Sequence, residues 1–141
     1  MWFEFLKTLK EKLSEETGAK VFVGITEPND LRDYPFVSLV PAEFYAEEDK
    51  KVMLLAVAFG VKVREREKKD PVKLEERGTN ELLNLMSQIE KVLEENKNIK
   101  HFRIDERKET VRHFEVRPPE FLAEMHVLVT APKFQPPMED F

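Results

Sequence analysis

The sequence contains no cysteine, only four glycines and no long apolar run. The absence of cysteine excludes disulfides, thiol nucleophiles and Cys-ligated zinc together. With so few glycines, there is no glycine-rich loop of the kind that cradles phosphate groups. No apolar run approaches the roughly 20 residues that a membrane helix needs, and charged residues interrupt every apolar stretch of the N-terminal segment. We therefore expect no membrane association, no signal peptide and no cofactor.

The composition is that of one folded domain with a heavily charged surface. Hydrophobic residues make up 41% of the 141 residues and charged residues 36%, with a net charge of −5. This balance argues against general affinity for nucleic acid or anionic membranes, and we expect no recognition of nucleic-acid sequence. The absence of cysteine, the many Lys and Glu residues and the nine prolines favour a thermophilic source. We expect a single domain over residues 1–132 and a flexible C-terminal tail over 133–141.

Two helices are predicted from apolar residues at helical spacing. The first carries an apolar stripe from Trp2 to Leu13, and Gly18 can terminate it. The second is expected to begin with Thr79 as N-cap and to end near residues 96–98, after a charged connection over residues 68–78. Its apolar face comprises Leu82, Leu83, Met86, Ile89 and Leu93.

Three strands are predicted in the first half of the chain: residues 20–26, residues 35–44, and Val52 to about Glu67. In the second half, two short strands around a charged turn are predicted within residues 101–116, and a last strand over residues 121–131. Pro41 marks the second strand as an edge strand or as bulged, and Gly60 is a candidate bulge in the third. The order, close to αβββαβββ, predicts an α+β fold: a mainly antiparallel sheet with both helices packed on one face. The last strand is expected to carry a second face that is partly apolar, which favours a partner there.

The third predicted strand is too long for its domain. Sixteen extended residues would span roughly 50 Å at ~3.3 Å per residue. A compact domain of this length has a diameter of only about 35–40 Å. We therefore expect the strand to bend or to leave the globule before Pro71, and a neighbouring subunit is one way to accommodate it.

No residue pattern of catalytic chemistry stands out. The three histidines, His101, His113 and His126, lie too far apart in sequence for a simple metal clamp. The acidic clusters at 47–49 and 105–106 fall in predicted turns, where carboxylates are usually solvated. We therefore expect no enzyme activity and no metal site. An enzyme that acts through carboxylates or a metal is the least favoured alternative, because its Asp and Glu residues would have to converge from separate strands.

The charged end of the long strand is our candidate subunit interface. On a strand, the basic and acidic residues of the sequence RERE point to opposite faces. Such a two-faced ribbon is suited to pairing with copies of itself. The alternative is a solvated hairpin whose charges guard an edge against aggregation. The interface candidates are Arg64, Glu65, Arg66, Glu67, Lys68 and Lys69.

The order of these segments resembles a known family. An N-terminal helix is followed by "YPFVSLVPAE", "VMLLAVAFGVKV", a charged loop, "GTNELLNLMSQIEKVLEE", "FRIDERKETVRHFEV" and "FLAEMHVLVTAP". Over residues 1–132 this is similar to the tail terminator and minor tail (tail-completion) proteins of long-tailed bacteriophages. The resemblance implies a hexameric ring that caps the tail tube and joins it to the head. Tube and head-connector proteins would be its partners. It would be located in the virion tail, and in the host cytoplasm during assembly.

The resemblance supplies no catalytic residue, and it rests on the order and texture of the segments. A small α+β binding or regulatory module of ferredoxin-like type is therefore kept as the alternative. Its weakness as an RNA-binding domain is the lack of aromatic stacking residues in a basic strand context. Genes for tail tube, tape-measure and head-connector proteins beside this one would favour the tail protein.

Overall fold

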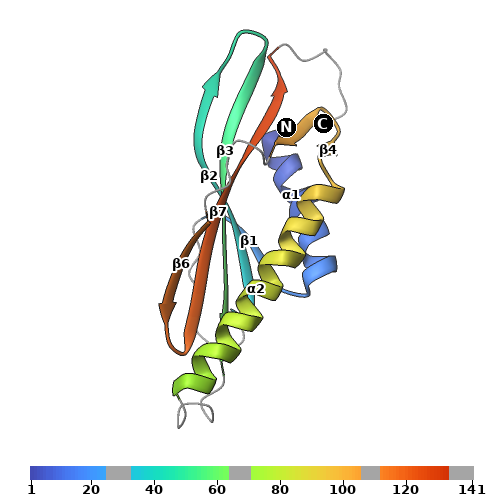
Figure 1. Ribbon diagram of the computed structural model, residues 1–141. Coiled ribbons are helices and arrows are strands. Elements are labelled where there is room, and N and C mark those ends of the chain that lie inside the picture. Colours follow the sequence, from blue (N-terminus) through green and yellow to red (C-terminus); the bar gives the residue numbers. More distant parts are fainter. Residues whose placement is uncertain (25–32, 64–70, 106–111, 134–141) are drawn as a thin grey trace.

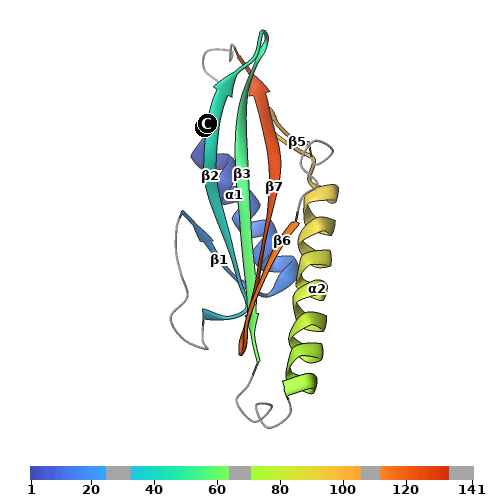
Figure 2. The same ribbon diagram turned by 60° about the vertical axis from the view of Figure 1, so that its left-hand side comes forward.

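The computed structural model describes residues 1–24, 33–63, 71–105 and 112–133. It confirms the predicted α+β fold, with two helices on one face of a curled, mostly antiparallel sheet (Figures 1 and 2). The elements in chain order are α1 (Trp2–Thr17), β1 (Lys20–Val23), β2 (Phe36–Ala46), β3 (Lys50–Lys62), α2 (Pro71–Glu95), β4 (Asn98–Ile99), β5 (Phe102–Asp105), β6 (Arg112–Arg117) and β7 (Glu120–Pro132).

The two long strands β3 and β7 form the middle of the sheet. They pair along their whole length, from Lys50 opposite Pro132 to Lys62 opposite Glu120. The strand order is β1-β2-β3-β7-β5-β4, and β1 is parallel to β2. Both predicted short strands of the 101–116 segment pair with the free side of β7, β5 near one end and β6 near the other. The two-residue strand β4 was not predicted, because so short a strand leaves no periodic pattern.

The first helix forms as its apolar spacing predicts. Its residues at the i, i+3, i+4 positions are buried, including Phe5, Leu9 and Leu13. Gly18 ends it with φ of 69°, a left-handed conformation that glycine adopts without steric cost, and its N–H donates to the Ser14 carbonyl at 3.1 Å. This closure turns the chain directly into β1.

The predicted start of the second helix was wrong. The helix begins at Pro71 and not at Thr79, so most of the expected charged connection is helical. Proline is favoured in the first turn because that turn needs no N–H donor. Gly78, inside the helix, does not terminate it. A Cβ atom there would lie 2.1 Å from the Phe121 ring, so glycine allows α2 to pack closely against β7.

The bulge lies in β2 and not in β3. The register between β2 and β3 shifts between Pro41 and Glu43, which confirms the bulge predicted at Pro41. Gly60 pairs regularly with Phe36 and with Leu122, so the bulge predicted there was wrong. A Cβ atom at Gly60 would come within 2.5 Å of the Leu122 side chain and 2.7 Å of the Phe36 ring. The glycine therefore makes room for these two side chains.

The long strand β3 is confirmed up to Lys62, with 13 residues. At ~3.3 Å per residue it spans about 43 Å, longer than the diameter expected for a compact domain of this length. The sheet is correspondingly elongated, and the β2–β3 hairpin extends at one end (Figure 1). The predicted continuation over residues 64–67 lies outside the described residues.

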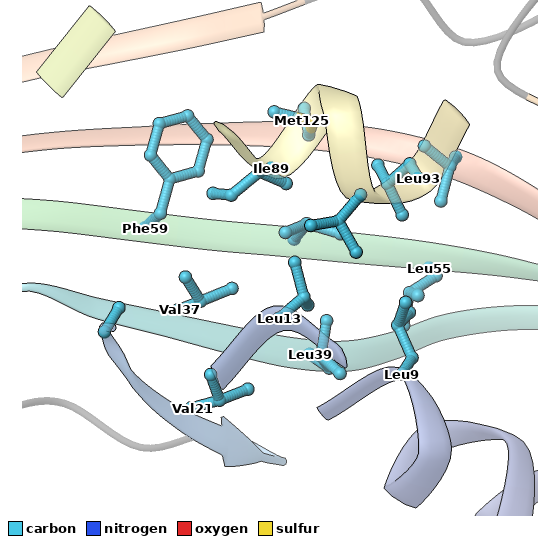
Figure 3. Packing of buried hydrophobic residues seen from close by; sticks show 14 of the residues in the cluster. Leu9, Leu13, Val21, Val37, Leu39, Leu55, Phe59, Ile89, Leu93 and Met125 are labelled. Carbon is cyan, nitrogen blue, oxygen red and sulfur yellow. The ribbon is translucent and has the colours of Figure 1, made fainter. Parts of the chain in front are cut away.

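The core lies between the helices and the inner face of the sheet (Figure 3). As predicted, Leu9 and Val57 are fully buried there, while Met86 is partly buried at its margin. Alternate residues of β7 from Phe121 to Ala131 are buried on this face. The period-2 pattern of that strand thus identified the inner face correctly.

Candidate interaction surfaces

The described residues hold no group of three or more His, Cys, Asp or Glu side chains that could bind a metal ion. His101 lies in the turn before β5, His113 in β6 and His126 in β7. The Nε2 atom of His126 lies 2.7 Å from Oε2 of Glu124, its neighbour along the same face of β7. None of the helices in the described part of the chain is long and apolar enough to cross a membrane.

The predicted interface residues, Arg64 to Lys69, lie in the segment 64–70, outside the described residues. Only its two ends are described. Val63 donates its N–H to the Pro119 carbonyl at 2.9 Å, beside the β6–β7 turn, and Pro71 begins α2. The role of the segment therefore stays a prediction.

The outer face of the sheet, which points away from both helices, is the first such surface. No described helix lies over it (Figures 1 and 2). Cross-strand registers bring its residues into rows across β2, β3 and β7, such as Val40, Ala56 and His126, or Ser38, Ala58 and Glu124. The side chains of its middle part are mostly apolar and mostly half-buried: Val40, Leu54, Ala56, Ala58, Leu122 and Leu128, with Thr130, His126 and Glu124 among them.

Tyr34 closes one end of this outer face. Its ring meets Phe36 edge-on, with centroids 5.4 Å apart, and its hydroxyl donates to Oε2 of Glu120 at 2.9 Å. The Lys62 ammonium lies 5.7 Å from the same ring. The Tyr34 side chain thus contacts β2, β3 and β7 beside Gly60. Phe36 is buried at this end of the face. Further along this face three more side chains are buried: Ser38, Val52 and Ala56.

An aromatic cluster joins α1 to the β2–β3 hairpin on the inner side. Trp2 lies 5.4 Å from Phe44 and 4.9 Å from Phe102, and Phe102 lies 5.1 Å from Phe5. Phe5 and Phe102 are buried, whereas Phe44 remains 56% exposed. This cluster was not predicted from the sequence, because the position of Phe44 in its strand does not indicate how far the hairpin extends past the helices.

Among the described residues, no strand pairs with one edge of β2 over its second half. The parallel strand β1 covers β2 only from Phe36 to Leu39. From Val40 to Ala46 the described residues provide β2 with a partner on the β3 side alone. Phe44 and Tyr45 are about half exposed in this stretch, and Glu43 is exposed beside them. We call residues 42–46 the β2 edge.

The strand β6 is free on its side away from β7, within the part of the chain that the structure describes. Phe114 and Val116 are about half exposed, although they lie opposite inner-face residues of β7. Glu115 and Arg117 project to the other face and form an exposed, loose ion pair of 3.8 Å. We call residues 112–117 the β6 edge. The sequence predicted this strand but gave no indication that one side of it would lack a partner.

A scan against protein-family models finds no match, and a search of curated proteins finds none either. The candidate interaction surfaces of the described residues are the outer face of the sheet, the β2 edge and the β6 edge.

Proposed function

We propose that this protein is a structural assembly protein of the tail-terminator kind and not an enzyme. Its copies form a ring, a hexamer as the resemblance implies, that caps the tail tube and contacts the head connector. It acts in the virion tail and assembles in the host cytoplasm. The observation that carries the proposal is the apolar outer face of the sheet, over which no described helix lies (Figure 2).

This face differs from the usual solvated side of an antiparallel sheet. Such sheets commonly alternate apolar residues inward with polar residues outward. Here β3 places Leu54, Ala56 and Ala58 outward, and β7 adds Leu122 and Leu128. Exposed apolar patches mark interaction sites, and on this face the apolar side chains of the single chain are half-buried, with Ala56 buried. An assembly that covers the patch removes this area from water, at roughly 25 cal/mol per Å².

The proposal predicts a concentration-dependent assembly that decorates tube ends. Light scattering of the purified chain should show species larger than a monomer. Alternatively, these species should arise once tail tubes built from the tube protein of the same genome are added. Electron microscopy of that mixture should then show rings at one end of each tube. A chain that stays monomeric and never decorates tube ends would contradict the proposal and favour a small binding module instead.

A second prediction concerns the segment 64–69. Changing Arg64 and Arg66 together to Glu should hinder assembly, because the mixed charges of this segment suit pairing between copies. The thermal midpoint of the monomer should remain nearly unchanged, because exposed charges contribute little to folding. Lys10→Glu with Lys12→Glu, two exposed changes on α1, is the control for net charge. Normal assembly of the Arg64/Arg66 variant, or an unfolded monomer, would assign the segment to a solvated or intramolecular role.

A further inference from the structure

We infer that copies of this chain join head to tail through their sheets, with the β2 edge of one copy pairing with the β6 edge of the next. This inference rests on the proposed function and identifies the subunit contact within it. The two edges belong to opposite sides of the same sheet, because the order across it is β2-β3-β7-β6 (Figure 2). An interface between two different edges is heterologous, and repeating it produces a ring when the rotation closes and an open filament when it does not.

Strand direction is compatible with this pairing. β2 is antiparallel to β3, β3 to β7, and β7 to β6. β6 therefore runs opposite to β2. When two copies stand side by side in the same orientation, as ring symmetry requires, the β2 edge of one copy lies antiparallel to the β6 edge of its neighbour. The alternation of strand directions then continues from copy to copy without interruption.

Both edges carry large apolar side chains on the inner face. On the inner face, Phe44 of one copy would meet Phe114 and Val116 of the next, and all three are about half exposed in the single chain. Aromatic and β-branched cross-strand pairs of this type contribute roughly 0.2–1 kcal/mol each. Such burial is a reason for apolar residues to occupy a free edge, a position that proteins otherwise protect with charge.

The charges at the two edges are complementary. Residues 42–49, the β2 edge and the hairpin turn after it, contain four acidic residues and no basic residue. Residues 112–117 contain two arginines and one glutamate. Copies meeting β2 edge to β2 edge would bring acidic stretches together, whereas head-to-tail contact brings an acidic stretch to a basic one. The association should accordingly weaken as salt screens the charges.

The two edges lie at different heights along the sheet, and a ring can accommodate this stagger. Through the registers, Phe44 is level with Val129, whereas Phe114 and Val116 are level with Ala123 and Phe121, an offset of six to eight residues, or about 20–26 Å at ~3.3 Å per residue. Four strands about 4.8 Å apart span roughly 19 Å across one copy. To close a ring with this offset, the strands must tilt by about 50° from the ring axis, near the ~35–45° of closed barrels.

Cysteine cross-linking tests the contact, and every cross-link can be assigned to an introduced thiol because the chain has no cysteine of its own. Ala46→Cys and Val116→Cys place one thiol on each edge, at exposed positions that lie opposite inner-face residues. With a short bis-maleimide under assembly conditions, the double variant should produce a ladder of cross-linked species up to the full ring. Each single variant alone should remain uncross-linked, and a mixture of the two single variants should stop at dimers.

The control pairs Val116→Cys with Ser87→Cys, an exposed position of α2 away from both edges, and should yield no ladder. Rings that form normally without a ladder in the Ala46/Val116 variant would overturn the edge contact and leave the proposed function standing. Cross-linked dimers from Val116→Cys alone would overturn head-to-tail pairing in favour of a symmetric β6–β6 contact. A wild-type chain that never assembles, even beside tail tubes, would overturn both.

Discussion

Replacing Leu9 by Ala should lower the free energy of unfolding by about 2–5 kcal/mol, the usual range for a buried leucine. The Leu9 side chain is fully buried between α1 and the inner face of the sheet (Figure 3). Truncation removes apolar contacts and leaves a cavity that the long paired strands β2 and β3 are too rigid to fill completely. Urea unfolding of the monomer, followed by circular dichroism, measures the loss.

Leu83→Ala is the matched control. Leu83 belongs to the apolar stripe predicted for the second helix, but the structure leaves it 41% exposed. The same chemical change there should cost less than about 1 kcal/mol, since an exposed side chain loses little burial and leaves no cavity. A loss below roughly 1 kcal/mol at Leu9, outside the range for buried leucines, would show that α1 does not pack on its own sheet in solution.

Gly78→Ala should destabilise the protein by up to about 2 kcal/mol, the cost of overpacking less the ~1 kcal/mol by which alanine favours helix over glycine. The added Cβ atom would lie 2.1–2.3 Å from three atoms of the Phe121 ring, which is fully buried and has no free space to enter. Overpacking of a tight core typically costs about 1–3 kcal/mol, and this cost exceeds the gain in propensity. Thermal and urea unfolding would measure the difference.

Two further variants separate packing from propensity. Asn84→Ala, at an exposed position of the same helix, should stabilise by a few tenths of a kcal/mol, because only propensity changes there. Phe121→Leu combined with Gly78→Ala should cost less than the sum of the two single changes, because the smaller side chain makes room for the new methyl group. Stabilisation by Gly78→Ala alone would mean that α2 lies further from β7 than the structure places it.

The sequence determined most of the elements and the inner faces of α1 and β7. The helical spacing of α1, the alternation of β7 and the turn between Ala46 and Lys50 are local patterns, and each formed as predicted. These patterns can be recognised in the sequence because burial of one face makes apolar residues recur every 3.6 residues in a helix and every 2 residues in a strand. The α+β class followed, because two amphipathic helices and one amphipathic sheet can bury their apolar faces only against each other.

The tertiary structure decided where glycine and proline act. Gly78 and Thr79 have the local features of a helix start, yet α2 continues through both residues. Glycine occupies position 78 because the Phe121 ring leaves no room there for a Cβ atom. Gly60 has the local features of a bulge, yet it makes room for Phe36 and Leu122. The deciding partners lie 24 or more residues away along the chain, so no local window of sequence contains them.

The candidate site divides in the same way. That the second face of β7 is partly apolar followed from its sequence alone. Three properties followed only from strand order and register: this face has no described helix over it, β1 covers only half of β2, and β6 has a described partner on one side alone. A sequence specifies which residues are apolar at each position. Whether such a residue is buried depends on which other segments of the chain pack against it, and the tertiary fold decides that.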